Sequence, residues 1–101
     1  MILNVHKRGK DMVVAACDEP LLDKTIRGGE LKMHISRKFY GEEVCSEEEL
    51  IAALRRCTSA NLVGKEVIAV AVKAGFIMEG CVIYVGKVPH AQLYRVPSGP
   101  L

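Results

Sequence analysis

The chain has 101 residues, of which 50% are apolar and 26% charged, the size and composition of one globular domain with a single core. Its formal net charge of +2 permits an anionic partner without requiring one. The longest apolar runs, residues 12–17 and 67–72, are too short to cross a bilayer, and the charged residues that follow from Lys7 do not fit a secretory signal. We therefore expect a cytoplasmic protein with no membrane partner, made of one domain (1–96) and a flexible tail (97–101).

The four cysteines, Cys17, Cys45, Cys57 and Cys81, are at least a dozen residues apart. Structural zinc sites usually contain a close pair such as C-x2-C, which this spacing lacks. We predict free, mostly buried thiols in a reducing compartment, and no cofactor.

The N-terminal third of the chain predicts a hairpin followed by a short helix. Residues 2–7 alternate and residues 12–17 form an apolar run, and the two segments flank a Gly-containing turn at 8–11. Asp18 then stands where a helix cap belongs. We expect a short helix over residues 21–26, ended by the glycine pair that follows.

The middle of the chain predicts a strand, a loop and a well-capped helix. Residues 30–35 alternate as a strand does, and residues 36–44 suggest a loop anchored by Phe39 and Tyr40. Ser46 and Glu49 have the spacing of a capping box, which predicts the start of a helix.

The C-terminal part predicts a buried helix and two more strands. Residues 58–64 are expected to link to the alanine-rich, apolar helix 65–75, and residues 81–85 and 88–96 to form strands. The predicted order is ββαβααββ. This order indicates a small, single α+β domain whose helices pack on one face of a mostly antiparallel or mixed sheet.

Four blocks of the sequence carry a resemblance to a known family. They are VVAACDEPLLDKTIRGGEL, FYGEE, EELIAALRRCTSANLVG and VPHAQLYRV. Their combination resembles an uncharacterised archaeal family, domain of unknown function 424, over nearly the whole chain. The resemblance implies an archaeal cytoplasmic protein of this size, in a family labelled as predicted to bind RNA, with no established catalytic or binding residue to carry over.

The polar faces of the predicted strands provide the candidate site. Single-stranded RNA is bound by rings that stack on bases, amides that bond base edges and cations that hold phosphate. We predict phosphate contacts from Lys7, Arg8, Lys10, Arg37 and Lys38, and base contacts from His6, His90, Gln92 and Tyr94. The protein would then associate with RNA or the translation machinery without catalysing a reaction.

Other interpretations of these residues stay open. The polar face can simply meet solvent, as one face of an antiparallel sheet commonly does. A protein partner can bind the sheet edge or the Phe39–Tyr40 loop instead. An enzyme would use Cys17 with a histidine, although Asp18 and Glu19 disfavour the thiolate and favour a structural thiol.

Three weaker patterns complete the candidate sites. The three histidines lie in three predicted strands and could together bind zinc. Gly64 and Lys65 begin the buried helix, where an anion can bind. Residues 42–49 contain five glutamates, which we interpret as a solvated loop and a capped helix start.

Overall fold

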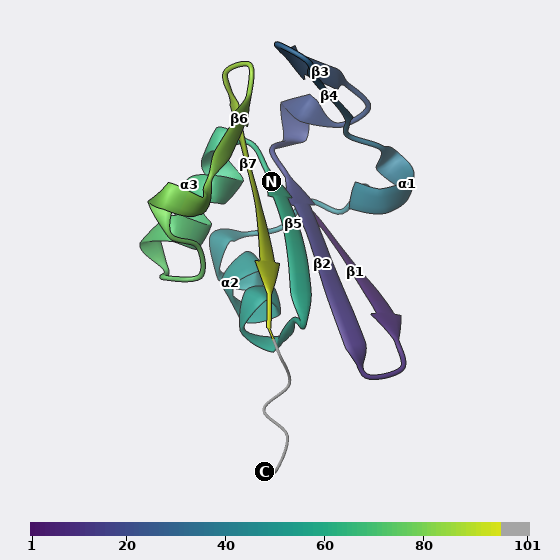
Figure 1. Ribbon diagram of the computed structural model, residues 1–101. Helices are drawn as coiled ribbons and strands as arrows, with labels where there is room; N and C mark the ends of the chain where they lie inside the picture. The colour runs from purple at the N-terminus through teal and green to yellow at the C-terminus, as the bar shows by residue number, and fades with distance from the viewer. Residues whose placement is uncertain (96–101) are drawn as a thin grey trace.

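A five-stranded mixed sheet forms the centre of the structure, a computed structural model that describes residues 1–95 (Figure 1). In spatial order its strands are β1 (Ile2–Arg8), β2 (Asp11–Cys17), β5 (Ser59–Val63), β7 (Val88–Tyr94) and β6 (Ile83–Val85). Strands β2 and β5 run parallel, and the other neighbours run antiparallel.

The remaining elements are a small sheet and five helical segments. The small sheet is the antiparallel hairpin of β3 (Thr25–Gly28) and β4 (Leu31–His34). The α-helices are α1 (Arg37–Tyr40), α2 (Glu47–Arg56) and α3 (Lys65–Lys73), and the 3-10 helices are η1 (Glu19–Leu21) and η2 (Glu79–Cys81). The predicted class, a single α+β domain with a mixed sheet, is confirmed. Val96 and the expected tail at 97–101 lie outside the described residues.

Two predicted elements are wrong in type. Where a helix was expected at 21–26, the chain forms the last residue of η1 and then the first residues of β3. The glycine pair 28–29, expected to end that helix, lies instead at the hairpin turn between Gly28 and Leu31. A six-residue apolar segment is too short for its periodicity to separate helix from strand.

The second wrong prediction is the linker at 58–64, which is the strand β5 in the middle of the sheet. Its serine and asparagine resemble loop composition, but both alternate with buried residues. The short helix α1 also replaces part of the loop expected at 36–44. Ser36 caps the N-terminus of α1, because its side chain accepts a hydrogen bond from the Phe39 amide.

One face of the central sheet is covered by α2 and α3 (Figure 1). The predicted capping box of α2 is confirmed: Ser46 accepts from the Glu49 amide, and Glu49 accepts from the Ser46 amide. Buried leucines of α2 and valines of α3 pack against the small and branched residues of β2, β5 and β7. No helix within residues 1–95 is long and apolar enough to span a membrane.

The second face is covered only in part, by the segment that contains β3, β4 and α1. Its buried residues Ile26, Ile35 and Tyr40 pack on the sheet residues Ile2, Cys17, Val63 and Val85. We call these four sheet residues the covered half. The prediction that all helices lie on one face therefore holds for α2 and α3 but not for α1, whose buried tyrosine packs on the other side.

A contact between two glycines holds the small sheet against the central one. Gly28 ends β3, and Gly86 lies in the turn between β6 and β7, with φ +64°. A Cβ atom added to Gly28 would lie 1.9 Å from the Gly86 nitrogen. The two backbones approach this closely only because neither residue carries a side chain.

The glycine contact predicts the effect of Gly28→Ala. The added methyl group meets backbone that cannot move aside, so the free energy of unfolding should fall by about 1–3 kcal/mol or more. Gly80→Ala is the matched control, since a Cβ atom there meets nothing within 4 Å, and it should change stability by less than about 0.5 kcal/mol. Thermal or denaturant unfolding measures both. Equal stability of the two variants would contradict the close contact.

Candidate functional site

The rest of the second sheet face carries mostly polar side chains, and residues 1–95 leave most of it open. Tyr94 lies opposite Ser59, Gln92 lies opposite Asn61, and His6 lies opposite Val13. We call these six residues the open half of the sheet. Tyr94 is 71% exposed, so the open half presents an aromatic ring and two amides to solvent.

Phe39 of α1 borders the open half and fixes His6. The two rings stack with centroids 5.1 Å apart and an angle of 11° between their planes. The Phe39 carbonyl accepts hydrogen bonds from His6 Nε2 at 2.8 Å and from Asn4 Nδ2 at 3.1 Å. Because a carbonyl oxygen can only accept, His6 Nε2 carries the proton of this hydrogen bond. The same nitrogen therefore cannot also accept a hydrogen bond from Asn4 Nδ2, which lies 3.3 Å away.

Two grooves meet at Phe39. The first groove, of about 690 Å³, is lined by His6, Lys7, Arg8, Asp11, Val13, Phe39, Thr58, Ser59, Tyr94 and Arg95. The second groove, of about 530 Å³, lies between the β3–β4 hairpin and the strands β5, β6 and β7. It is lined by Leu31, Lys32, Met33, His34, Ser36, Phe39, Tyr40, Asn61, Ile83, Val85, His90 and Gln92.

The grooves bring together several of the residues predicted from the sequence. His6, Lys7, Arg8 and Tyr94 share the first groove, and His90 and Gln92 share the second. Lys10 lies in the two-residue turn between Arg8 and Asp11, beside the first groove. Lys38 is exposed on α1, next to Phe39.

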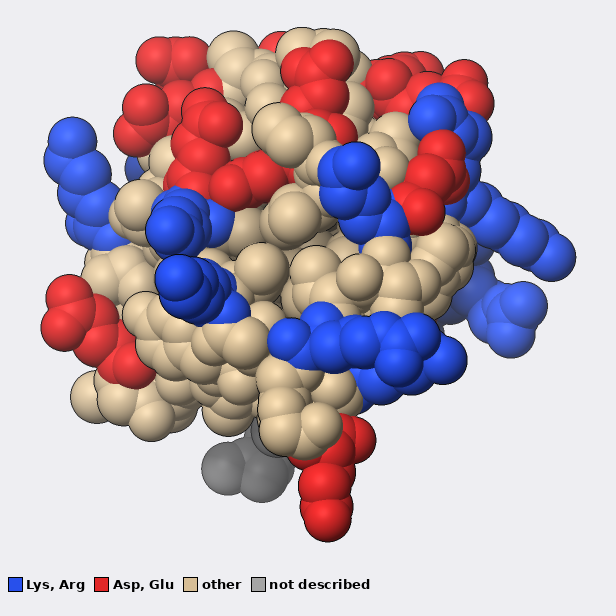
Figure 2. Space-filling view, turned by 90° about the horizontal axis from the view of Figure 1, so that it is seen from above, with Lys and Arg blue, Asp and Glu red and all other residues tan. Residues whose placement is uncertain are grey.

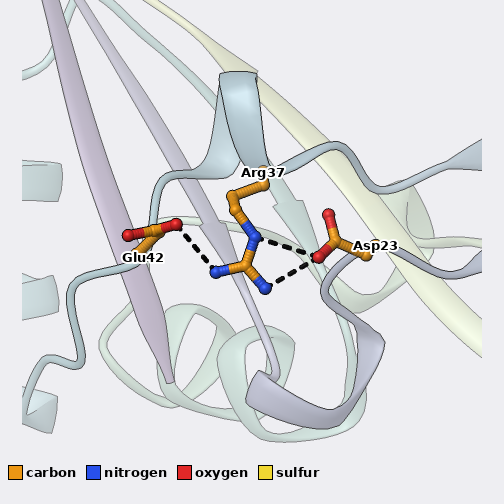
Figure 3. A network of polar contacts seen from close by, with 3 residues as sticks. All are labelled: Asp23, Arg37 and Glu42. Atoms are coloured by element: carbon orange, nitrogen blue, oxygen red, sulfur yellow. Dashed lines mark hydrogen bonds and ion pairs between the residues drawn. The ribbon is translucent and has the colours of Figure 1, made fainter.

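Arg37 is held by acidic neighbours. Its guanidinium donates to Asp23 Oδ2 through Nε at 2.9 Å and Nη2 at 2.7 Å, and to Glu42 Oε1 through Nη1 at 2.9 Å (Figure 3). These hydrogen bonds raise the pKa of Arg37 and fix α1 to the chain on both sides of it. The Arg37 guanidinium is therefore engaged by Asp23 and Glu42 and is less available to a phosphate than the sequence predicted.

The surface charges are mixed. Seen from above, acidic side chains concentrate along one rim, and Lys and Arg side chains spread over much of the rest (Figure 2). Two of the five glutamates in 42–49 have structural partners, because Glu42 pairs with Arg37 and Glu49 caps α2.

His90 and Gln92 each use part of their hydrogen-bonding capacity within the sheet. His90 Nδ1 donates to the Leu62 carbonyl at 3.0 Å, which leaves Nε2 as an acceptor in the neutral ring. Gln92 Nε2 donates to Asn61 Oδ1 at 2.9 Å, which leaves its second N–H and Oε1. Both residues therefore keep polar atoms for a ligand.

Phe39 and Asn61 belong to this surface but were not among the site residues predicted from the sequence. Phe39 reaches His6 across 33 residues, and no local pattern predicts that contact. Asn61 could have been found, because its alternation with buried Ala60 and Leu62 indicates a strand.

The three histidines have separate partners: His6 bonds to Phe39, His34 to Thr25 and His90 to Leu62. Within the described part of the chain no three His, Cys, Asp or Glu side chains are grouped as metal ligands.

The N-terminus of α3 is already occupied by a carboxylate. Asp18 accepts hydrogen bonds from the Glu66 amide at 3.0 Å and the Val67 amide at 2.9 Å. Gly64 has φ +116°, and a Cβ atom there would lie 2.3 Å from Asp18 Cγ. Asp18 was predicted to cap the helix that follows it. It caps α3 instead, and it fills the anion site considered at Gly64–Lys65.

This long-range cap predicts the effect of Asp18→Ala. Loss of both hydrogen bonds should lower the free energy of unfolding by about 0.5–2 kcal/mol, the usual cost of removing an N-cap. Glu19→Ala removes the adjacent exposed carboxylate and should cost less than about 0.5 kcal/mol. Urea unfolding of both variants makes the comparison, and equal losses would contradict the assignment of the cap.

All four cysteines are free, as predicted, and Cys17, Cys45 and Cys57 are buried. Burial, with a smaller effect from Asp18, raises the pKa of Cys17 to about 11. The thiolate is therefore scarce near neutral pH, and Cys17 is a poor nucleophile. Cys81 is exposed.

These environments predict selective labelling. At pH 8 a thiol reagent should modify Cys81 first and Cys17 only when the protein unfolds, which mass spectrometry of the labelled peptides can follow. The raised pKa of Cys17 also implies that its contribution to stability is lost as pH rises from about 9 to about 11, because the unfolded thiol ionises first. Rapid labelling of Cys17 in the folded protein would contradict its burial.

The fold and the site define a small α+β domain with one sheet face half open. The sequence matches the family described as "Protein of unknown function (DUF424)" over residues 6–96, and the chain belongs to that family. The crystal structure of an uncharacterized conserved protein from Methanopyrus kandleri is similar, with 29% sequence identity and a TM-score of 0.82 over 99% of this chain and 95% of the other. No curated protein matches. The family expected from the sequence is thus confirmed, and neither description states an activity or a ligand.

Proposed function

We propose that this protein binds single-stranded RNA along the open half of its sheet. The observation that carries the proposal is the meeting of two grooves at the stacked rings of Phe39 and His6, with Tyr94 in one groove and Gln92 in the other. Proteins that bind single strands combine aromatic platforms for bases with cations that follow the backbone.

The cations proposed to contact phosphate lie at the end of the β1–β2 hairpin. Arg8 and Lys7 line the first groove, and Lys10 is in the adjoining turn. Among the described residues Arg8 forms no ion pair within 4.0 Å. Asp11 lies opposite Arg8 and weakens the local positive potential, so we expect moderate rather than tight binding.

The rings proposed to contact bases are Tyr94, Phe39 and His6. Tyr94 is largely exposed, and the stacked pair gives a flat surface at the border of the grooves. Stacking tolerates any base, because every base has a π face. The cytoplasmic location and the link to translation expected from the sequence stay predictions.

A protein partner is the second candidate, and the edge of the sheet supports it. Tyr84 of edge strand β6 is 61% exposed and lines a groove of about 780 Å³ against α3. The Phe39–Tyr40 segment is less suitable for a protein partner, because Tyr40 is buried. The burial and raised pKa of Cys17 count against the enzyme hypothesis.

The proposal predicts a steep dependence of RNA affinity on salt. The paired substitution Arg8→Gln and Lys10→Gln should reduce the slope of log K against log salt by about 1.4, about 0.7 for each lost phosphate contact with a single strand. Fluorescence anisotropy with a labelled RNA octamer, measured across a salt series, gives the slope.

The matched control is Lys65→Gln with Lys73→Gln, which removes the same charge from α3 on the other side of the sheet. This variant should keep the wild-type slope. Binding that is absent at low salt, insensitive to salt, or equally changed by both pairs would contradict the proposal and favour a protein partner.

A further inference from the structure

The second groove has the composition of a pocket for a flat polar ring. Its volume of about 530 Å³ is within the range of small-molecule sites. Phe39, Met33 and Ile83 provide apolar surface, while Asn61, Gln92 and His90 provide polar atoms. Such a groove can cover both faces of a ring and bond its edge.

The amide pair gives the groove an oriented recognition group. Asn61 Oδ1 accepts from Gln92 Nε2, so the Gln92 amide nitrogen is on the Asn61 side and Oε1 is on the other. The remaining N–H and Oε1 of Gln92 form an adjacent donor and acceptor. This is the pattern with which a glutamine binds the N6 amino group and N7 of adenine together.

His90 adds a second acceptor. Because Nδ1 donates to the Leu62 carbonyl, Nε2 of the neutral ring carries a lone pair. A ligand that donates a hydrogen bond to Gln92 Oε1 and another to His90 Nε2 needs two donor hydrogens. The adenine amino group has two, whereas uracil has a single N–H donor.

Tyr40 forms part of the wall of this groove. The residue is 2% exposed and lines the groove, and no hydrogen bond of its hydroxyl occurs within residues 1–95. Every side-chain nitrogen or oxygen sealed from solvent in this part of the chain has a partner. The Tyr40 hydroxyl therefore keeps access to solvent, although buried tyrosine hydroxyls usually bond to a polar group.

We propose that the second groove binds an adenine base, with Gln92 and His90 bonded to its amino group and Asn61 holding Gln92 in orientation. Adenine is favoured over cytosine because the larger ring buries more of the apolar wall. The base comes from an RNA strand, in which case this inference rests on the proposed function, or from a free adenine nucleotide.

The test compares octamers of adenosine, cytidine and uridine with AMP, at one salt concentration, by anisotropy competition and equilibrium dialysis. The adenosine octamer should bind at least about fivefold more tightly than the uridine octamer, the lower limit for one bidentate amide–base contact. Gln92→Leu should bring this ratio to about one, because it should weaken binding of the adenosine octamer more than binding of the uridine octamer. Asn61→Ala should lower the ratio in part, and thermal unfolding checks that both variants fold.

Tyr94→Leu is the matched control, since it removes a stacking ring from the first groove and should weaken all octamers by a similar factor. Equal affinity for all octamers, or a preference that survives Gln92→Leu, overturns the adenine site and leaves RNA binding intact. If no octamer binds, the proposed function fails. AMP binding that is lost in Gln92→Leu then supports the site for a free nucleotide, and absence of AMP binding overturns it.

Discussion

The packing of residues 18–44 on only half of one sheet face determines most of what is distinctive in this structure. Ile2, Cys17, Val63 and Val85 are apolar, and the segment buries them beneath Ile26, Ile35 and Tyr40. Farther along β5 the same face carries Asn61 and Ser59, and the residues opposite them on β7 are Gln92 and Tyr94. Polar side chains thus replace the apolar ones that the segment covers. The strand register thus fixes both where the segment packs and where it stops.

The boundary between the covered half and the open half is where the grooves form. Phe39 stands at this boundary, stacked on His6 and positioned by a helix that Arg37 fixes to Asp23 and Glu42. The glycine contact between the β3–β4 hairpin and the β6–β7 turn fixes the other wall of the second groove. A surface held by packing and backbone contacts can offer aromatic and amide groups in a constant geometry.

The sequence predicted the elements whose signals are local. The β1–β2 hairpin follows from alternation and a tight turn, and α2 follows from Ser46 and Glu49. It failed for β3, which is too short to show a period, and for β5, whose polar residues resembled a linker although they alternate. The shared face of His90, Gln92 and Tyr94 was predictable because strand side chains alternate with period two. The stacking of Phe39 on His6 and the capping of α3 by Asp18 join residues far apart in the sequence, so only the fold places them together.

The central claim, that the open half of the sheet is a binding face, is tested most directly by amide NMR spectra recorded while single-stranded RNA is added. The proposal predicts that chemical shifts change at His6, Ser59, Asn61 and along residues 90–94, and that the amides of α3 stay unchanged. Shift changes confined to α3 and β6, or none at RNA concentrations that saturate other single-strand binding proteins, would contradict the claim.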